Sequence, residues 1–214
     1  MRIVFLGTPD FAVASLKALV ENDFDVVGVV TMPDKKSGRG MKIQQSAVKK
    51  YAVEQGLVVL QPENLKDEAF QLKLKELNPD LQIIVAFRML PASVWQLPKL
   101  GTFNLHGSLL PNYRGAAPIN WAVINGEKET GVTTFFLEHE IDTGEIIDFA
   151  KVEIGSNETA GELHDKLMTI GADLVIKTTR KIINGSVFTQ KQDDLLQGQK
   201  PKLAYKIFKD TSRI

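Results

Sequence analysis

Two polar side chains stand at the end of a segment that otherwise predicts a buried strand. In FNLHGSLLPNYRG, residues 103–115, Asn104 and His106 are two positions apart, so on a strand they point to the same face of the sheet. A lone buried histidine is more often a satisfied core residue, but two polar groups together need partners or a chemical role. Because open α/β sheets bind ligands just outside the carboxyl ends of their strands, the pair favours a ligand site.

Asp142 is the natural third member of this set. It lies in HEIDTGEII, residues 139–147, where Asp-Thr-Gly interrupts two apolar segments and predicts a tight turn. The simplest interpretation of an isolated Asp-Thr-Gly is a turn in which the aspartate caps the backbone. The same triplet marks aspartic proteases, but that chemistry needs two carboxylates that share a proton. A single copy in a chain with an α/β pattern excludes it.

Ser108 does not have the surroundings of a serine nucleophile. A nucleophile elbow has glycines two positions before and after the serine, whereas His106 and Leu110 occupy those positions here. We therefore interpret Ser108 as a loop residue that holds a ligand through its backbone or hydroxyl. For His139 and His164 we predict no role, since the first has no metal-ligand partner at useful spacing and the second falls off the apolar stripe of its helix.

The first predicted turn, GTPDF at residues 7–11, carries no nucleotide fingerprint. It has one glycine where G-x-G-x-x-G needs three, and the chain has no Walker A pattern. We expect Thr8 or Asp10 to act as a plain helix cap.

The composition describes an ordinary globular chain. Its 214 residues are 43% apolar and carry a formal net charge of zero, so any nucleic-acid contact must come from a local basic surface. The absence of cysteine excludes disulfides and thiolate chemistry. The N-terminus lacks the features of a signal peptide and no apolar run is long enough to span a bilayer, so we expect a soluble cytoplasmic protein.

Apolar strands alternate with helical patterns along the chain. Continuous apolar runs separated by amphipathic helices are typical of a parallel sheet covered on both faces, which predicts the α/β class. The expected strands are residues 3–6, 26–30, 58–60, 81–86 and 103–106, followed by a strand pair at 131–137 and 145–154, and the expected helices are 11–20, 68–77 and 162–183. Thr159 and Glu162 have the spacing of a capping box at the start of the last helix.

Two segments are predicted to be irregular. Residues 32–50 hold six basic residues against the single acid Asp34, and the glycines on either side of Arg39 favour a mobile tip rather than a packed element. From residue 184 onward polar and basic residues dominate, and we expect no closing element there.

Five motifs in order resemble the formyltransferases that use 10-formyltetrahydrofolate, and most closely the methionyl-tRNA formyltransferase family. The SLLP loop and the Asn104, His106 and Asp142 set are similar throughout this group, which includes glycinamide ribonucleotide and sugar-nucleotide formyltransferases. The G-R-G-x-K loop is similar to the tRNA enzymes in particular, whereas Arg88 and Met89 resemble the pterin-site loop of the purine enzyme. The motifs are GTPDFA at 7–12, PD…GRG.K across 33–42, N.HGSLLP.YRGAAPI at 104–119, TGVT at 130–133 and DTGEI at 142–146.

The resemblance implies a Rossmann-like, mostly parallel twisted sheet and transfer of the formyl group from 10-formyltetrahydrofolate to the α-amino group of initiator methionyl-tRNA. Asn104 would donate through its amide and His106 would stabilise the oxyanion of a tetrahedral intermediate. Asp142 would orient His106 and relay a proton through water, with no metal. The folate site would comprise Ser108, Leu109, Leu110, Pro111, Leu90, Arg88 and Met89, and the tRNA contacts Arg39, Lys42, Lys35 and Lys36.

The resemblance also implies an organisation of the chain. Residues 1–185 would be the catalytic domain, and residues 186–214 a basic tail or linker that leads to a C-terminal domain absent from this chain. We expect a monomer without membrane contact. The Leu110–Pro111 bond is cis in relatives, but the sequence alone leaves its cis or trans state open.

Four alternatives remain open at this point. The same chemistry could act on a small amine such as glycinamide ribonucleotide or an amino-sugar nucleotide. The chain could bind folate or tRNA without turnover, or release formate as a hydrolase. The basic loop could be a solvated surface segment without a partner.

Overall fold

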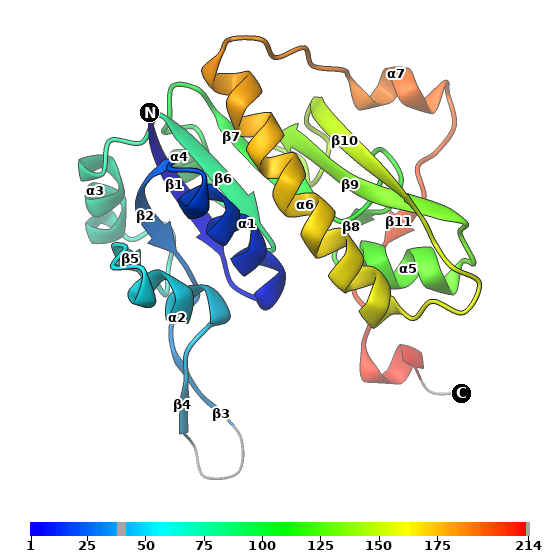
Figure 1. The fold of residues 1–214 in the computed structure, drawn as a ribbon, viewed down its shortest axis with the longest axis horizontal. Coiled ribbons are helices and arrows are strands. Elements are labelled where there is room, and N and C mark those ends of the chain that lie inside the picture. Colours follow the sequence, from blue (N-terminus) through cyan, green and yellow to red (C-terminus); the bar gives the residue numbers. More distant parts are fainter. Residues whose placement is uncertain (38–41, 213–214) are drawn as a thin grey trace.

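A seven-stranded sheet forms the centre of the molecule. The computed structural model describes residues 1–37 and 42–212, and its strands lie in the order β10-β9-β7-β6-β1-β2-β5 (Figure 1). The five strands β5, β2, β1, β6 and β7 run parallel, β9 pairs antiparallel with β7, and β10 pairs antiparallel with β9 at the edge of the sheet. The predicted α/β, mostly parallel sheet is confirmed. The strands are β1 (Arg2–Gly7), β2 (Asp25–Val30), β5 (Val59–Leu60), β6 (Leu81–Val85), β7 (Thr102–His106), β9 (Glu129–Phe136) and β10 (Ile146–Glu153).

Helices cover both faces of the sheet, as the continuous apolar strands require. On one face α1 (Asp10–Glu21) packs beside α6 (Ala160–Ile183), with α2 (Ala47–Glu54) against α1 and α5 (Pro118–Ile124) against α6. The buried stripe of α6 includes Leu163, Leu167 and Leu174. On the other face α3 (Glu68–Glu76) and α4 (Ala92–Trp95) pack against the opposite side chains of the same strands. No helix among the described residues is long and apolar enough to cross a bilayer.

The two long helices begin in different ways. At α6 the hydroxyl of Thr159 accepts a hydrogen bond from the Glu162 N–H at 3.2 Å, and the Glu162 carboxylate accepts one from the Thr159 N–H at 2.8 Å. This is the predicted capping box. At α1 the prediction of a Thr8 or Asp10 cap is wrong, because the N-cap is Pro9 and makes no side-chain bond. The buried hydroxyl of Thr8 has no hydrogen-bond partner among the described residues.

Part of the predicted basic loop is a hairpin. Strands β3 (Lys35–Ser37) and β4 (Lys42–Gln44) pair in antiparallel fashion and project from the body of the molecule (Figure 1). The predicted tip around Arg39 lies outside the described residues. At its base Asp34 forms a 2.5 Å ion pair with Lys49 and accepts a hydrogen bond from Gln61, and these two bonds hold the pKa of Asp34 below its usual range.

We expected no further helix or strand to complete the fold after residue 184, and this expectation is wrong. Helix α7 (Gln192–Leu196), strand β11 (Leu203–Ala204) and the 3-10 helix η1 (Lys209–Ser212) follow α6. Strand β11 pairs in parallel with β8 (Arg114–Gly115), so main-chain groups of the two segments satisfy one another. The domain boundary proposed at residue 185 stays a prediction, but residues 192–204 pack against the body of the fold.

Loss of the α6 capping box should lower the free energy of unfolding. Thr159→Ala removes a hydroxyl that accepts from the helix N-terminus, and we expect a loss of about 1 kcal/mol in a urea titration. Thr169→Ala is the matched control, because Thr169 is exposed within the same helix and its hydroxyl bonds only to the carbonyl of Asp165. Equal stability of the two variants would contradict the capping role.

Candidate active site

Asn104 and His106 lie at the carboxyl half of β7, where the sheet changes from parallel to antiparallel. Both side chains line a cavity of about 860 Å³, and Asp142 lines the same cavity from the loop between β9 and β10. The structure therefore brings together the three residues singled out in the sequence. Asn104 and His106 come from β7, and Asp142 comes from a loop that follows two strands later in the chain, after β8 and β9. His106 is 6% exposed, whereas Asn104 and Asp142 are partly exposed.

The ring of His106 is held through one of its two nitrogens. Nε2 lies 2.8 Å from the carbonyl oxygen of Tyr113, and a carbonyl can only accept, so Nε2 carries a proton and donates it. Nδ1 is then the nitrogen available for chemistry. It lies 3.7 Å from Oδ2 of Asp142, too far for a direct hydrogen bond but close enough for the two groups to interact electrostatically.

Asp142 is fixed by a tight turn and by a distant backbone donor. Its φ of 55° is left-handed, a conformation that Asp tolerates better than most residues. Two positions on, a Cβ at Gly144 would lie 1.7 Å from the carbonyl oxygen of Phe136, so only glycine fits. Oδ2 of Asp142 accepts a hydrogen bond of 2.9 Å from the N–H of Gly115. The carboxylate thus caps a segment 27 residues away.

The amide of Asn104 is left partly unsatisfied. Its Oδ1 atom is buried and has no partner among the described residues. Exchanging the amide oxygen and nitrogen would leave the amino end unpartnered in the same place. A buried amide without a partner is costly in a packed core, and this one lies beside the cavity.

The predicted folate residues fall into two groups. Arg88, Met89 and Leu90 line the cavity, and the Arg88 guanidinium donates to the backbone carbonyls of Pro62 and Glu63. Residues 108–111 are not among the described residues that line it.

Two of those four residues, Ser108 and Leu110, hold their own loop through hydrogen bonds. The Ser108 hydroxyl is fully buried and donates to the carbonyl of Asn112 at 2.7 Å, while the Leu110 N–H donates to the Thr133 hydroxyl. The Leu110 side chain packs with Phe135 and Ile146, and the Leu110–Pro111 bond, whose state the sequence left open, is cis. A role for Ser108 in holding a ligand through its hydroxyl is thus not supported by its hydrogen bonds.

Two histidines without a predicted role also line the cavity. His139 contacts Trp95 edge-on, with ring centroids 5.5 Å apart, and His164 contacts Phe11 in the same way at 5.2 Å. The signal available for His139 was its place three residues before Asp142 in the same loop. Among residues 1–37 and 42–212 no three His, Asp or Glu side chains gather as a metal site would require.

Tyr113, whose carbonyl holds His106, is itself held by a hydrogen bond and an ion pair that meet at Glu127. The Tyr113 hydroxyl donates to the Glu127 carboxylate, which also pairs with Lys202. These bonds, from Lys202 first and Tyr113 second, hold the pKa of Glu127 below its ordinary value of 4.5. Burial, and then the Glu127 carboxylate, raise the pKa of Tyr113.

Three comparisons relate the chain to known proteins. A family model described as Formyl transferase matches residues 1–179. The methionyl-tRNA formyltransferase of Bacteroides thetaiotaomicron is 59% identical over the whole of this chain, which spans 66% of that relative's length.

Solved structures share the fold at lower identity. An N-formyltransferase from Helicobacter canadensis, in complex with folinic acid and dTDP-3-aminofucose, has a TM-score of 0.70 at 25% identity and covers 99% of this chain and 72% of its own. Glycinamide ribonucleotide transformylase 1 from Symbiobacterium toebii has a TM-score of 0.74 at 18% identity, over 90% of this chain and 92% of its own. The latter likeness concerns the fold alone.

Lowering the pH should weaken the bonds of the Glu127 carboxylate to Lys202 and Tyr113. Because its pKa is lowered in the folded state, the stability it contributes is complete above the unfolded value of 4.5 and is lost as pH falls through the folded value. Glu127→Gln should therefore flatten the fall in melting temperature below pH 4.5. Glu129→Gln is the control, since Glu129 forms an exposed pair with Lys151. An unchanged slope in Glu127→Gln would contradict this account.

Proposed function

The chain belongs to the formyl transferase family, as its motifs predicted, and we propose that it transfers the formyl group of 10-formyltetrahydrofolate to the α-amino group of initiator methionyl-tRNA. The observation that carries the proposal is the meeting of Asn104, His106 and Asp142 at one cavity. Identity along the full chain to a methionyl-tRNA formyltransferase supports this acceptor over a small amine. We further propose a cytoplasmic monomer.

The cavity suits the proposed co-substrate. Its volume of about 860 Å³ lies within the range of sites that enclose a ligand of this size. The unpartnered amide end of Asn104 supplies a polar group beside it. Arg88, Met89 and Leu90 would hold 10-formyltetrahydrofolate, which supplies the formyl group.

Asn104 and His106 would stabilise the negative charge that develops on the formyl oxygen. The Asn104 amide can donate a hydrogen bond without any change of protonation. His106 can donate from Nδ1 only as the imidazolium, because Nε2 is engaged by Tyr113. The Asp142 carboxylate at 3.7 Å balances that charge. Preorganised donors of this kind contribute the largest share in many acyl transfers, about 3–4 kcal/mol each.

Asp142 would also manage the proton of the attacking amine. An α-amino group has a pKa of about 8, so part of it is neutral at pH 7 and needs no strong base for attack. The amine must lose a proton after attack and the leaving nitrogen must gain one. A carboxylate with one oxygen fixed by Gly115 and 3.7 Å from the imidazole can pass that proton through a bridging water.

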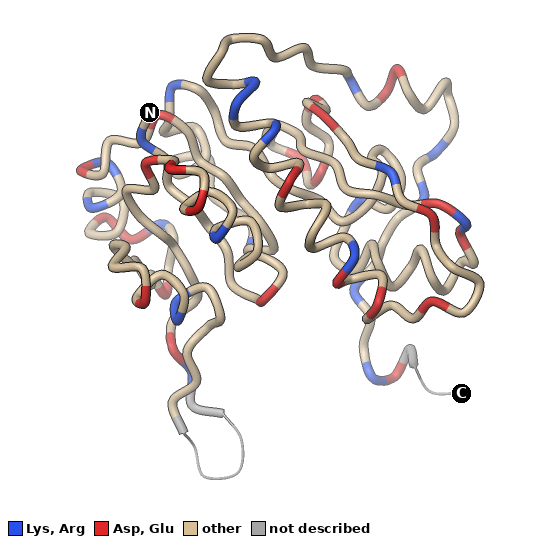
Figure 2. The backbone as a smooth tube through the Cα atoms, viewed as in Figure 1, with Lys and Arg blue, Asp and Glu red and all other residues tan. Residues whose placement is uncertain are grey.

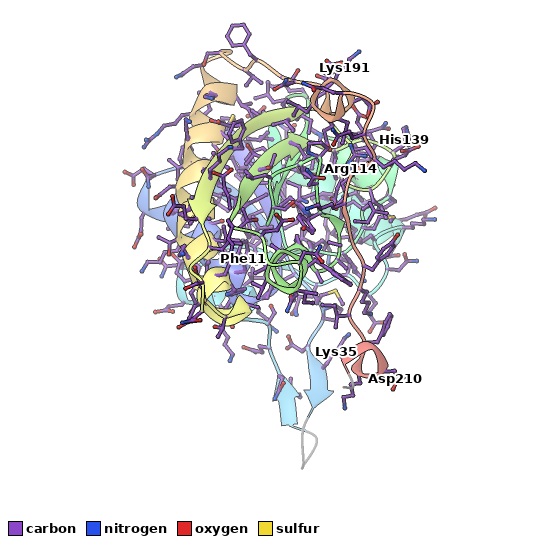
Figure 3. The ribbon with its side chains drawn as sticks, turned by 90° about the vertical axis from the view of Figure 1, so that its right-hand side faces the viewer. Phe11, Lys35, Arg114, His139, Lys191 and Asp210 are labelled. Atoms are coloured by element: carbon purple, nitrogen blue, oxygen red, sulfur yellow. The ribbon has the colours of Figure 1, made fainter. Side chains whose placement is uncertain are left out.

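The β3–β4 hairpin would provide the contact with tRNA. Lys35 is exposed on the hairpin, which projects away from the segment that carries Arg114 (Figure 3). Over the rest of the backbone basic and acidic residues are interspersed (Figure 2) and the formal net charge is zero, so this arm and not the global charge would attract phosphates. Lys36 and Lys42 belong to the same two strands, and Arg39 to the segment between them.

Substitutions in the cavity test the catalytic part of the proposal. Asn104→Ala, His106→Ala and Asp142→Asn should each lower kcat for formyl transfer to charged initiator tRNA, the first by roughly 100- to 1,000-fold because it removes a preorganised donor. Asn157→Ala, at an exposed turn, is the control and should leave the rate unchanged. Wild-type rates in the first two variants would refute the proposed site.

The acceptor is tested separately. We expect turnover with charged initiator tRNA to exceed turnover with glycinamide ribonucleotide or an amino-sugar nucleotide, and formate release without an acceptor to be slow. Lys35→Ala should raise KM for tRNA and reduce the salt slope of binding by about 1, the effect of one lost phosphate contact. Lys75→Ala, exposed on α3, is the control. A preference for a small amine, unaffected by Lys35, would favour the alternative acceptors.

A further inference from the structure

Gln192 is a buried polar residue outside the part of the chain that the family model matches. It begins α7 and is 2% exposed, whereas the match ends at residue 179. A glutamine side chain so deeply buried must find partners for its amide, or its desolvation is uncompensated. Its partners lie in the candidate active site.

The amide of Gln192 connects two parts of that site. Its Nε2 group donates to the carbonyl oxygens of Asp142 at 2.9 Å and Gly144 at 2.8 Å. Its Oε1 atom accepts from Nε of Arg114 at 2.9 Å. Both carbonyls can only accept and the arginine can only donate, so the orientation of the amide is determined. Reversal would turn all three attractions into repulsions.

These bonds complete the support of Asp142. The Asp142 carboxylate is held by the N–H of Gly115, and its carbonyl by Gln192. Arg114, the neighbour of Gly115 in β8, is the third partner of the same amide. The left-handed turn around Asp142 is therefore locked to β8 at both ends, and the 3.7 Å spacing to His106 depends on that connection.

The surrounding chain keeps Gln192 in place. Between residues 191 and 210 the backbone runs over the face that carries Arg114 (Figure 3). On its way the Lys202 carbonyl accepts from Tyr113 N–H at 2.6 Å, and the Ala204 carbonyl from Ala116 N–H at 2.7 Å. The segment thus contacts the residues that position both His106 and Asp142.

We infer that Gln192 is a positioning residue for formyl transfer, which acts by fixing the Asp142 turn against β8. The inference rests on the proposed function, because it presumes that Asp142 takes part in the reaction. Displacing a reacting group by about 1 Å can lower a rate on the order of 100-fold, while substrate binding elsewhere in the cavity is retained. The expected signature is a fall in kcat with little change in KM.

Two substitutions distinguish the bonds that Gln192 makes to the Asp142 turn from its bond to Arg114. Gln192→Glu keeps the size of the side chain and its contact with Arg114 but loses both donors to the turn. Gln192→Met keeps the length and loses all three bonds. We expect kcat for charged initiator tRNA to fall on the order of 10- to 100-fold in both variants, with KM for 10-formyltetrahydrofolate within about twofold. Gln190→Met, two residues earlier and exposed, should behave as the wild type.

A double substitution distinguishes positioning from a general loss of structure. If Gln192 acts through Asp142, then Gln192→Glu should add little to the defect of Asp142→Asn, whereas an independent structural effect would multiply with it. Melting temperatures of all variants are measured in parallel.

The outcomes also separate this inference from the proposed function. If Asp142→Asn lowers kcat but Gln192→Glu keeps the wild-type rate, or multiplies fully with Asp142→Asn, the positioning role is wrong and the proposed function stands. If Asp142→Asn leaves kcat unchanged, the catalytic proposal fails and the inference fails with it. The role is supported if Gln192→Glu lowers kcat in the wild-type protein with KM retained, but adds little to the defect of Asp142→Asn.

Discussion

The hydrogen bond between Nε2 of His106 and the carbonyl of Tyr113 is the constraint on which the candidate site depends. It commits one ring nitrogen to the backbone, so that the other faces Asp142 and the cavity. A histidine at the end of a strand could adopt other rotamers, and the Asp142 carboxylate at 3.7 Å is too far to select one by a direct bond. The backbone carbonyl therefore sets the direction in which the imidazole can exchange a proton.

Residues 113–117 connect the remaining parts of the site. The Tyr113 carbonyl holds His106, the Gly115 N–H holds Asp142, and the N–H groups of Ala116 and Ala117 both bond to the carbonyl of Ala204. Such close packing of backbones requires glycine at 115. Its φ is 122°, and a Cβ there would lie 2.5 Å from the Ala204 carbonyl oxygen. The missing side chain at Gly115 allows residues 113–117 to bond with His106, Asp142 and Ala204 at once.

The sequence predicted those features whose signal is carried by side chains. The unbroken apolar runs of β1 and β6 predicted a sheet covered on both faces, and Thr159 with Glu162 predicted the start of α6. What could not be predicted depends on main-chain contacts between distant segments. The pairing of β8 with β11 and the hydrogen bonds of Gln192 to Asp142 leave no periodic pattern. The prediction that Thr8 caps α1 was wrong for a related reason. The residue type suits a cap, but the N-cap position of the helix is occupied by Pro9.

The pairing of β8 with β11 also bears on how the molecule is built during synthesis. Asn112 bonds to Lys202, a partner 90 positions later in the chain, so the loop that orients His106 closes only when that late segment has emerged. The parallel sheet and its helices require no residue beyond α6 for their own pairing. Contacts of such long sequence separation form slowly, since the entropy of closing a large loop is lost before the contact is gained. A nascent chain would thus form the sheet and its helices before the candidate site is assembled.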